Sequence, residues 1–318
     1  MRLRRGALVA AIAVLLAGCG RGASSRSATK QSSASTAASA STAPAQPRPR
    51  RPAQAPYPRL LPAATASAPT NFAAAASWRG QTAAWVAQRA GVTLLRFNQR
   101  LLTLHLHSGT VDAGSTGWRY GPAIAGLERR RLVAAFNGGF KLDVGAGGFE
   151  SGGRVAVPLS AGLGSIVTYA NGYTDIGAWH DGVPAGGQPV VSVRQNLHLL
   201  ISAGHPAADV ACLLCWGATL GGTASPARSA LGVTADGRLI WAGGENLTTG
   251  ALAVALQGAG VQRAVELDIN PEWVAAYLYS HRHGPNLPVF VPMVPGQHGI
   301  LGEFLAPYSR DFFTVVAR

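Results

Sequence analysis

The feature that most constrains this chain is a series of short segments in which apolar and polar residues alternate, each bounded by turn residues. Residues 101–109 (LLTLHLHSG), 164–179 (GSIVTYANGYTDIGAW) and 263–274 (RAVELDINPEWV) follow this pattern. Strand side chains point to opposite faces with a period of two, so each segment predicts a β-strand or hairpin. The 40 glycines cluster between such segments and mark loops and close approaches of the backbone. Regular strand–helix alternation is absent, which argues against a barrel or a doubly wound sheet.

Two hairpins, one helix and a closing strand can be placed on this background. The Asn-Gly of residues 171–172 and the Asp-Gly of residues 236–237 are typical of tight hairpin turns. Residues 248–258 are rich in helix formers, with Thr at the start and Gly at the end. The final segment, RDFFTVVAR, predicts a last strand. We therefore expect an α+β class, a sheet-rich single domain with few helices.

The first 70 residues differ in composition from the rest of the chain. Three early arginines precede an apolar run, residues 7–17, which has the form of a secretory signal and is too short to span a bilayer. The run ends in LAGC, which resembles a bacterial lipobox. Residues 1–19 are therefore predicted to be a lipoprotein signal peptide that ends at a lipidated Cys19, the alternative being an ordinary signal peptide with a chance Cys. Residues 20–70, almost without large aliphatic side chains, predict a disordered Ala/Ser/Pro/Arg-rich tether, and residues 71–318 the folded domain.

The charge of the chain is concentrated in this tether. Residues 1–70 hold ten of the 27 Lys and Arg and no Asp or Glu, which leaves 17 basic and 14 acidic residues, a net charge of +3, for the domain. Such a balance gives no reason to expect a nucleic-acid partner. A basic tether beside a membrane would favour anionic lipid or wall polymer, or would simply be a soluble linker. With Cys19 lipidated, the protein is expected to be extracytoplasmic and anchored to the bacterial cell membrane.

The two remaining cysteines, Cys212 and Cys215, form a C-x-x-C pair. Outside the cytoplasm this spacing favours a small disulfide loop. A redox site, free thiols or a metal site remain open, although no thioredoxin-like context surrounds the pair and no further zinc ligands are suitably spaced.

The segment RAVELDINPEWV raises the main question about function. In an alternating strand, one face carries three aliphatic residues and the other carries Glu266, Asp268 and Asn270, up to the break at Pro271. If that polar face were exposed to solvent, the row would be unremarkable. If it faces a cleft, Glu266 and Asp268 could hold a divalent cation such as Ca, Mg or Mn, or one of them could act as a general base.

Other candidates lie at strand ends and on alternating strands. Asn137, Gly138 and Gly139 follow an apolar strand and precede Lys141, a pattern that can present backbone N–H groups to an anion or form a plain turn. Arg228 precedes a strand and could hold a phosphate or carboxylate, or be an ordinary surface residue.

Two further pairs share strand faces. Arg194 and Asn196 could reach a cleft from one strand. His105 and His107 could bind metal, but no third ligand is near in sequence.

In combination, several of these motifs resemble a known family. The FNGGF strand end, the RSALGVTADGRL hairpin, the following helix and GVQRAVELD resemble, in order and spacing, the phosphodiester glycosidase family, to which N-acetylglucosamine-1-phosphodiester α-N-acetylglucosaminidase belongs. The resemblance covers about residues 101–318, and GAWHDG and VSVRQNLHLLIS look like a bacterial secreted branch. One departure is that the family commonly continues LDGGGS where this chain reads LDINPEW.

The resemblance implies a catalytic α+β domain that hydrolyses a sugar-1-phosphodiester between C1 and the phosphate oxygen, without an organic cofactor. By position, Asn137 and the Gly138-Gly139 backbone would contact substrate, Arg228 would hold the phosphate, and Asp268 would be the central carboxylate. The expected substrate is a sugar-phosphate glycan or glycolipid of the cell envelope. The altered LDINPEW motif also allows a non-catalytic surface lipoprotein that binds anionic envelope glycans.

Overall fold

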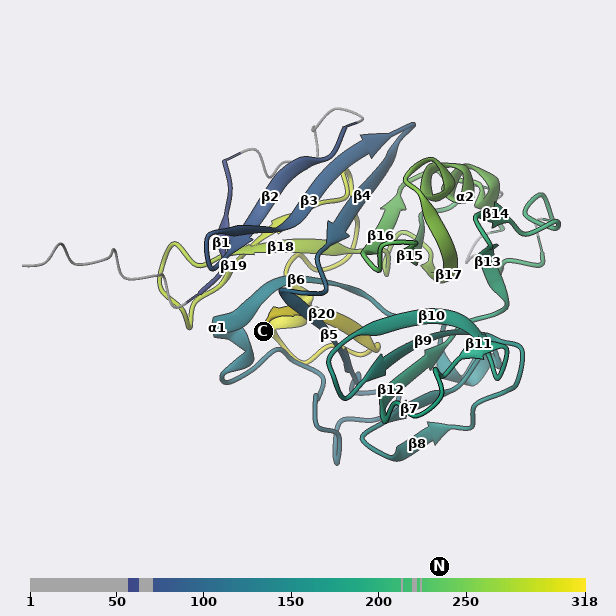
Figure 1. Cartoon of the computed structure of the whole chain (residues 1–318), viewed down its shortest axis with the longest axis horizontal. Helices are drawn as coiled ribbons and strands as arrows, with labels where there is room; N and C mark the ends of the chain where they lie inside the picture. The colour runs from purple at the N-terminus through teal and green to yellow at the C-terminus, as the bar shows by residue number, and fades with distance from the viewer. Residues whose placement is uncertain (1–56, 63–70, 213, 219–221, 224) are drawn as a thin grey trace, which may run out of the picture. The chain divides into compact units, whose positions relative to one another are not determined.

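Antiparallel β-sheets make up most of the computed structural model, which describes residues 57–62, 71–212, 214–218, 222–223 and 225–318 (Figure 1). The described residues lie within one compact unit, Pro52–Arg318, and form three sheets. The expectation of a sheet-rich fold with few helices is confirmed. No helix in the described part of the chain is both long and apolar enough to cross a membrane. The predicted signal peptide, Cys19 and most of the predicted tether lie outside the described residues.

The largest sheet has nine strands, and all its neighbouring strands pair antiparallel. Its first strand is a correction to the predicted boundary at residue 71, because it lies inside the predicted tether and pairs with the next strand. The domain therefore begins before residue 71. The strand order is β1 (Arg59–Leu60), β2 (Ala73–Trp78), β3 (Gln81–Arg89), β4 (Val92–Phe97), β16 (Leu239–Gly244), β15 (Arg228–Thr234), β17 (Val261–Ile269), β13 (Leu199–Ser202) and β14 (His205–Pro206).

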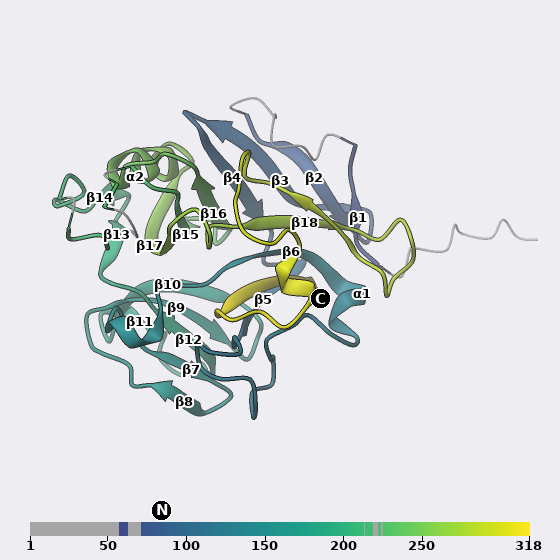
Figure 2. The same cartoon turned by 180° about the vertical axis from the view of Figure 1, so that it is seen from behind.

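Two smaller sheets complete the fold (Figure 2). The six-stranded sheet has the order β11 (Gly182–Val183), β10 (Thr174–Trp179), β9 (Gly164–Tyr169), β12 (Val190–Gln195), β7 (Phe149–Ser151) and β8 (Arg154–Val157), and only its β10–β11 pair is parallel. The five-stranded sheet has the order β19 (Val289–Pro292), β18 (Ala276–Ser280), β6 (Leu132–Asn137), β20 (Phe312–Ala317) and β5 (Leu102–His107).

Helical structure in the described residues is limited to two α-helices and two 3-10 turns. These are α1 (Glu128–Arg131), α2 (Thr249–Gly258), η1 (Leu142–Val144) and η2 (Glu303–Leu305). The hydroxyl of Thr248 caps α2 by accepting from the Ala251 N–H at 3.1 Å, as the Thr-rich start of this segment predicts. Leu252 and Leu256 of α2 lie in a core cluster with residues of the nine-stranded sheet. The predicted hairpins, β9–β10 and β15–β16, and the closing strand β20 are also confirmed.

The main hydrophobic core joins the sheets and brings the ends of their strands together. It includes Phe97 of β4, Leu104 of β5, Phe136 of β6 and Leu267 of β17. Where β6 ends, the Gly138 carbonyl accepts a hydrogen bond from the Asp268 N–H at 2.9 Å. The two stretches singled out by the sequence, NGGF and ELDIN, therefore meet in the folded chain.

Candidate active site

Strand β17 carries Glu266 and Asp268, and neither side chain faces solvent. Glu266 is 0% exposed and Asp268 is 3% exposed, while Val265 and Leu267 lie in the main core. Both faces of the strand are buried, so the simple solvent-facing alternative for the polar row is wrong. Buried charges need compensating partners, and those partners define the site.

A register shift between β15 and β17 gives the two carboxylates different surroundings. β17 advances three residues, from Glu266 to Ile269, while β15 advances two. At this irregularity the Asp268 N–H bonds outside the pair, to Gly138, and its carbonyl accepts from the hydroxyl of Ser229 at 2.9 Å. A bulge bends its strand and re-aims side chains, commonly next to functional sites. Here the two carboxylates meet two different arginines.

Glu266 forms an enclosed ion pair with Arg228. Arg228 Nη1 lies 2.7 Å from Glu266 Oε1, and the guanidinium also donates to the carbonyls of Leu247 (3.1 Å) and Trp216 (3.0 Å). Burial raises the pKa of Glu266 to about 8, although Arg228 acts to lower it. Arg228 lines a hollow of about 320 Å³ at the start of α2 and does not line the larger cavity described below.

Asp268 forms the second pair, with Arg310. Asp268 Oδ2 lies 2.7 Å from Arg310 Nη2, and Arg310 also pairs with Asp112. Burial raises the pKa of Asp268 to about 7, with Arg310 opposing the shift. A carboxylate that changes protonation near neutral pH is suited to proton transfer. Arg310 Nη1 is buried without a hydrogen-bond partner among the described residues.

A third ion pair explains the two glycines of NGGF. Arg194 binds Asp311 through Nε–Oδ2 at 2.8 Å and Nη2–Oδ1 at 3.1 Å, and both side chains are buried. A Cβ on Gly138 would stand 2.2 Å from Asp311 Oδ2, and one on Gly139 would stand 2.8 Å from Arg194 Cζ. Glycine is thus required here because the loop passes against the ion pair.

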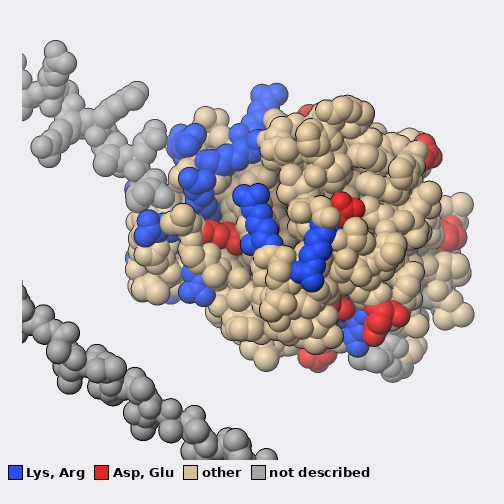
Figure 3. Space-filling model, turned by 90° about the horizontal axis from the view of Figure 1, so that it is seen from below, with Lys and Arg blue, Asp and Glu red and all other residues tan. Residues whose placement is uncertain are grey.

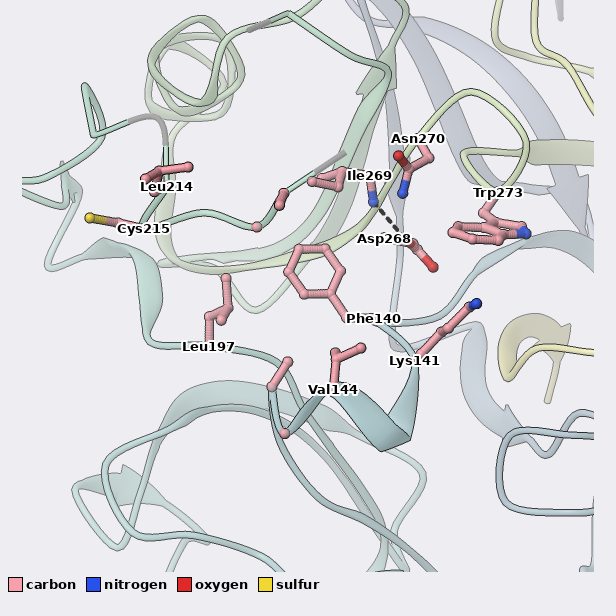
Figure 4. Close-up of a pocket in the computed structure, with 14 residues that line it drawn as sticks. Phe140, Lys141, Val144, Leu197, Leu214, Cys215, Asp268, Ile269, Asn270 and Trp273 are labelled. Atoms are coloured by element: carbon pink, nitrogen blue, oxygen red, sulfur yellow. Dashed lines mark hydrogen bonds between the residues drawn. The ribbon is translucent and has the colours of Figure 1, made fainter. Parts of the chain in front are cut away.

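A cavity of about 450 Å³ lies beside Asp268 (Figure 4). Its wall is mostly apolar, and Lys141, Asp268 and Asn270 supply its main polar side chains. The close-up places Asp268 between Asn270 on one side and Trp273 and Lys141 on the other. The lining residues are Phe140, Lys141, Val144, Gly145, Ala146, Leu197, Leu214, Cys215, Gly217, Ala218, Asp268, Ile269, Asn270 and Trp273.

Two cations contact the ring of Trp273. The Arg310 guanidinium carbon lies 4.6 Å from the ring centroid and Lys141 Nζ lies 5.0 Å from it. Cation–π contacts of this kind fix the orientation of both partners. The indole therefore stands at the cavity wall with positive charge beside it and the Asp268 carboxylate close by.

Asn270 explains how the chain accommodates the departure from LDGGGS. Its φ is +99°, a left-handed conformation that glycine adopts freely and that Asn tolerates better than most residues. The carbonyl of Asn270 accepts from the N–H groups of Trp273 (3.1 Å) and Val274 (3.2 Å), which closes a turn. The turn needs one left-handed residue, and the Asn supplies it while adding an amide to the cavity lining.

Of the predicted substrate and catalytic residues, Asp268, Lys141 and Asn270 line the cavity. Asn137 Nδ2 donates to the Ser229 hydroxyl at 2.9 Å. Asn196 Nδ2 donates to the Glu266 carbonyl at 2.7 Å. The predicted substrate contacts of Asn137, Gly138, Gly139, Arg194, Asn196 and Arg228 remain predictions, because none of these residues lines the cavity.

Arg310 and Trp273 were not singled out from the sequence. Arg310 and Asp311 stand directly before the apolar run of β20, and two adjacent charges entering a buried strand are the signal that could have identified them. Trp273 follows the Pro271 break, so its position beside Asp268 depends on the turn at Asn270.

The donor set around Glu266 and Asp268 fits an anion better than the predicted divalent cation. Each carboxylate has an arginine within 2.7 Å, and a cation there would compete with a fixed positive charge. The described part of the chain also contains no group of three His, Cys, Asp or Glu residues arranged to hold a metal ion. The predicted divalent cation therefore stays a prediction.

The two cysteines form a disulfide, Cys212–Cys215. Cys215 lines the cavity beside Asp268, and Cys212 lines the hollow beside Arg228. The disulfide therefore joins the wall of the cavity to the wall of the hollow beside Arg228.

Comparison with known proteins gives similarity to solved structures alone. No family model and no curated protein matches the chain. The catalytic domain of zebrafish N-acetylglucosamine-1-phosphodiester alpha-N-acetylglucosaminidase, auto-inhibited by its pro-peptide, is 15% identical with a TM-score of 0.47, over 78% of this chain and 81% of that one. A Synechocystis protein is 14% identical with a TM-score of 0.41, over 74% and 61%. A Burkholderia pseudomallei protein described as exported is 14% identical with a TM-score of 0.34, over 71% and 73%.

Proposed function

We propose that this protein is an extracytoplasmic hydrolase that cleaves the bond between C1 of a sugar and a phosphate oxygen in a sugar-1-phosphodiester. The observation that carries the proposal is Asp268. It is a buried carboxylate with a pKa raised to about 7, at the wall of a cavity and 2.7 Å from a guanidinium. The sequence resemblance to phosphodiester glycosidases supports the same reaction.

The chemistry needs one titrating carboxylate rather than the usual pair. A phosphate ester leaves as a stable anion, so its departure needs little proton donation, unlike the alkoxide of an ordinary glycoside. Ionised Asp268 would take a proton from water as the water oxygen bonds to C1. The C1–O bond to phosphate breaks, and its electron pair leaves with the phosphate. Direct attack of Asp268 on C1 is the other route open to the same carboxylate.

Positive charge near the reacting carboxylate would stabilise the negative charge of the departing phosphate. Lys141 lines the cavity, and Arg310 Nη1 retains an unused donor. Cations arranged before the reaction stabilise developing negative charge without reorganisation. The apolar wall and the Trp273 ring would hold the sugar, because aromatic and apolar surface excludes water from a cavity of this size.

The site also permits a function without turnover. Asp268 is 3% exposed and already paired with Arg310, so the cavity could bind an anionic envelope glycan and leave it intact. In that case the Asp268→Asn variant would bind glycan as the wild type does, and neither protein would release a product.

We also propose that the protein is lipid-anchored at the outer side of the bacterial cell membrane through Cys19. The signal-like residues 1–19 support this, as does the Cys212–Cys215 disulfide, since disulfides persist in oxidising compartments. Mass spectrometry of protein extracted from membranes tests it, because diacylglyceryl modification of an N-terminal Cys19 is expected, and an unmodified N-terminus would contradict it.

The proposed reaction is tested by incubating the full-length protein with UDP-sugars and synthetic sugar-1-phosphodiesters in ¹⁸O-labelled water. We expect the label in the released sugar, because the water attacks C1. Label in the phosphate would show cleavage at phosphorus and contradict the proposal. EDTA should leave the rate unchanged, and a loss of rate restored by Ca, Mg or Mn would reinstate the predicted cation.

A further inference from the structure

A second hollow, larger than the Asp268 cavity and sharing no lining residue with it, lies around helix α1. Its volume is about 690 Å³. We call it the α1 groove. The groove is formed by α1, β5, the end of β20 and the segment at Tyr120, and its lining residues are Thr103, His105, Arg119, Tyr120, Leu127, Glu128, Arg130, Arg131, Val316, Ala317 and Arg318.

Four arginines line the α1 groove against one carboxylate. They are Arg119, Arg130, Arg131 and Arg318, and none forms an ion pair with an acidic side chain among the described residues. Residues 71–318 carry a net charge of only +3, so this concentration is local. Figure 3 shows one face of the molecule on which Lys and Arg side chains gather toward one side.

Glu128, the one acidic residue that lines the groove, already contacts side chains of β5 and β20. Glu128 Oε1 accepts from the Thr314 hydroxyl at 2.6 Å and lies 2.9 Å from His105 Nδ1 and 3.2 Å from His107 Nε2. Burial acts to raise the pKa of Glu128, but the two histidines hold it below its usual value. His105 and His107, which the sequence left open as a metal pair, therefore both contact this carboxylate, and none of the four arginines pairs with an acidic side chain among the described residues.

The arginines retain donors for a ligand. Arg119 and Arg131 are exposed. Arg130 uses Nε on Asn286 Oδ1 at 2.7 Å, and no described residue accepts from its two Nη groups. Arg318 donates Nε and Nη1 to backbone carbonyls, which fixes its guanidinium beside the groove. Planar guanidinium groups with free parallel N–H donors match phosphate oxygens in pairs.

The positive surface extends beyond this hollow. A neighbouring hollow of about 430 Å³ shares Leu127 and Arg130 with the α1 groove and adds Arg129 and Asn286. The two hollows adjoin at Leu127 and Arg130, and between them five arginines line the surface around α1. Five guanidinium groups are more than a single phosphate can contact, whereas a chain of phosphates offers a partner to each.

We propose that the α1 groove binds a strand of a soluble polymer that bears repeated phosphate groups. Its arginines would contact successive phosphates, and the stacked Tyr120 and His105 rings, 4.1 Å apart, form part of its wall. The proposal is independent of catalysis, because the groove shares no residue with the cavity at Asp268.

The test compares short-chain inorganic polyphosphate with inorganic phosphate, using full-length protein and calorimetric titration at two salt concentrations. Arg130→Gln/Arg131→Gln should weaken polyphosphate binding roughly tenfold. It should also reduce the salt dependence of binding, because a protein that contacts fewer phosphates releases fewer counterions when it binds. The matched control is Arg79→Gln/Arg100→Gln, which removes two exposed arginines outside the groove and should leave the affinity within about twofold. Because both pairs are exposed, thermal unfolding should be unchanged.

Three results would overturn the proposal. One is equal loss of affinity in the groove and control variants, which would assign binding to general charge, including the basic residues 1–70. The second is unchanged binding in the groove variant. The third is binding confined to phosphatidylglycerol-containing vesicles, which would make the groove a membrane contact. Asp268→Asn should bind polyphosphate normally while losing turnover, and the groove variant should still hydrolyse a small substrate, so the two proposals fail separately.

Discussion

Strand β17 carries two buried carboxylates, Glu266 and Asp268, and each pairs with a different arginine. The two pairs differ in what surrounds them. Arg228 of the first pair donates to two backbone carbonyls, whereas Asp268 of the second pair lines a cavity and its partner Arg310 contacts Trp273 in the wall of that cavity. Burial raises both carboxylate pKa values, to about 8 and about 7. A shifted pKa is thus common to both pairs. Asp268 itself lines the cavity, whereas in the other pair only Arg228 borders a hollow and Glu266 does not. We therefore propose that Asp268 carries the chemistry and that Glu266 has a structural role.

The largest expected effect on stability comes from removing the enclosed carboxylate. Glu266→Leu leaves the Arg228 charge buried without its partner, which should cost about 3–5 kcal/mol of unfolding free energy. Glu266→Gln is the matched control, since it keeps an acceptor for Arg228 Nη1, and it should cost clearly less. Urea unfolding followed by tryptophan fluorescence measures both, and equal costs would show that the acceptor kept by Gln does not compensate the buried Arg228.

The disulfide sharpens the comparison because it connects the linings of the two sites. Replacing Cys212 and Cys215 by Ser should lower the unfolding free energy by about 2 kcal/mol, from the loop-closure entropy of so short a loop. Since Cys215 lines the cavity, KM should rise as well, and kcat should change less. Thermal unfolding and steady-state kinetics of the double variant test this, and unchanged KM would separate the loop from substrate binding.

Raised carboxylate pKa values also fix the sign of the pH dependence. The folded state binds protons more tightly than the unfolded chain, whose values lie near 4, so these two groups make stability fall as pH rises from about 4 to about 8. Asp268→Asn removes one contribution and should give a shallower fall. Urea midpoints measured from about pH 5 to about pH 8 decide this, and identical slopes would mean that Asp268 titrates normally.

The smallest expected effect is at the exposed rim of the cavity. Lys141→Gln should lower kcat for a sugar-1-phosphodiester roughly fivefold, on the order of 1 kcal/mol, with little change in KM, because the phosphate gains negative charge as it leaves. Lys141→Arg is the control that keeps the positive charge and should stay closer to wild type. A rise in KM with unchanged kcat would instead show that Lys141 only binds the substrate.

The sequence was sufficient where local pattern determines structure. Alternation predicted the strands, Asn-Gly and Asp-Gly predicted the hairpins, and the Thr248-Thr249 pair predicted the start of α2, where Thr248 is the N-cap. The polar row of β17 was also visible, because a period of two places Glu266 and Asp268 on one face. The burial of this row was not visible, since the arginines that pair with it come from other segments, Arg228 from β15 and Arg310 from the residues before β20.

The rest of the site depends on contacts between distant segments. Arg310 reaches Asp268 across 42 positions of sequence only because β20 pairs with β6, whose following loop contacts β17. The bulge opposite Arg228 similarly changes which arginine each carboxylate meets, and no residue in ELDI marks it. The sequence left Arg228 open to a phosphate or a carboxylate, and the family resemblance implied phosphate. In the structure its guanidinium pairs with the Glu266 carboxylate, and the phosphate contact stays a prediction.

The most direct test of the account is kcat/KM on one sugar-1-phosphodiester for wild type, Asp268→Asn and Glu266→Gln, each first shown to be folded. The account predicts a loss of about 10²–10⁴-fold in Asp268→Asn, typical of a missing acid–base group, and a loss within about tenfold in Glu266→Gln. Wild-type rates in folded Asp268→Asn, or a deeper loss in Glu266→Gln, would contradict the assignment of chemistry to the cavity carboxylate.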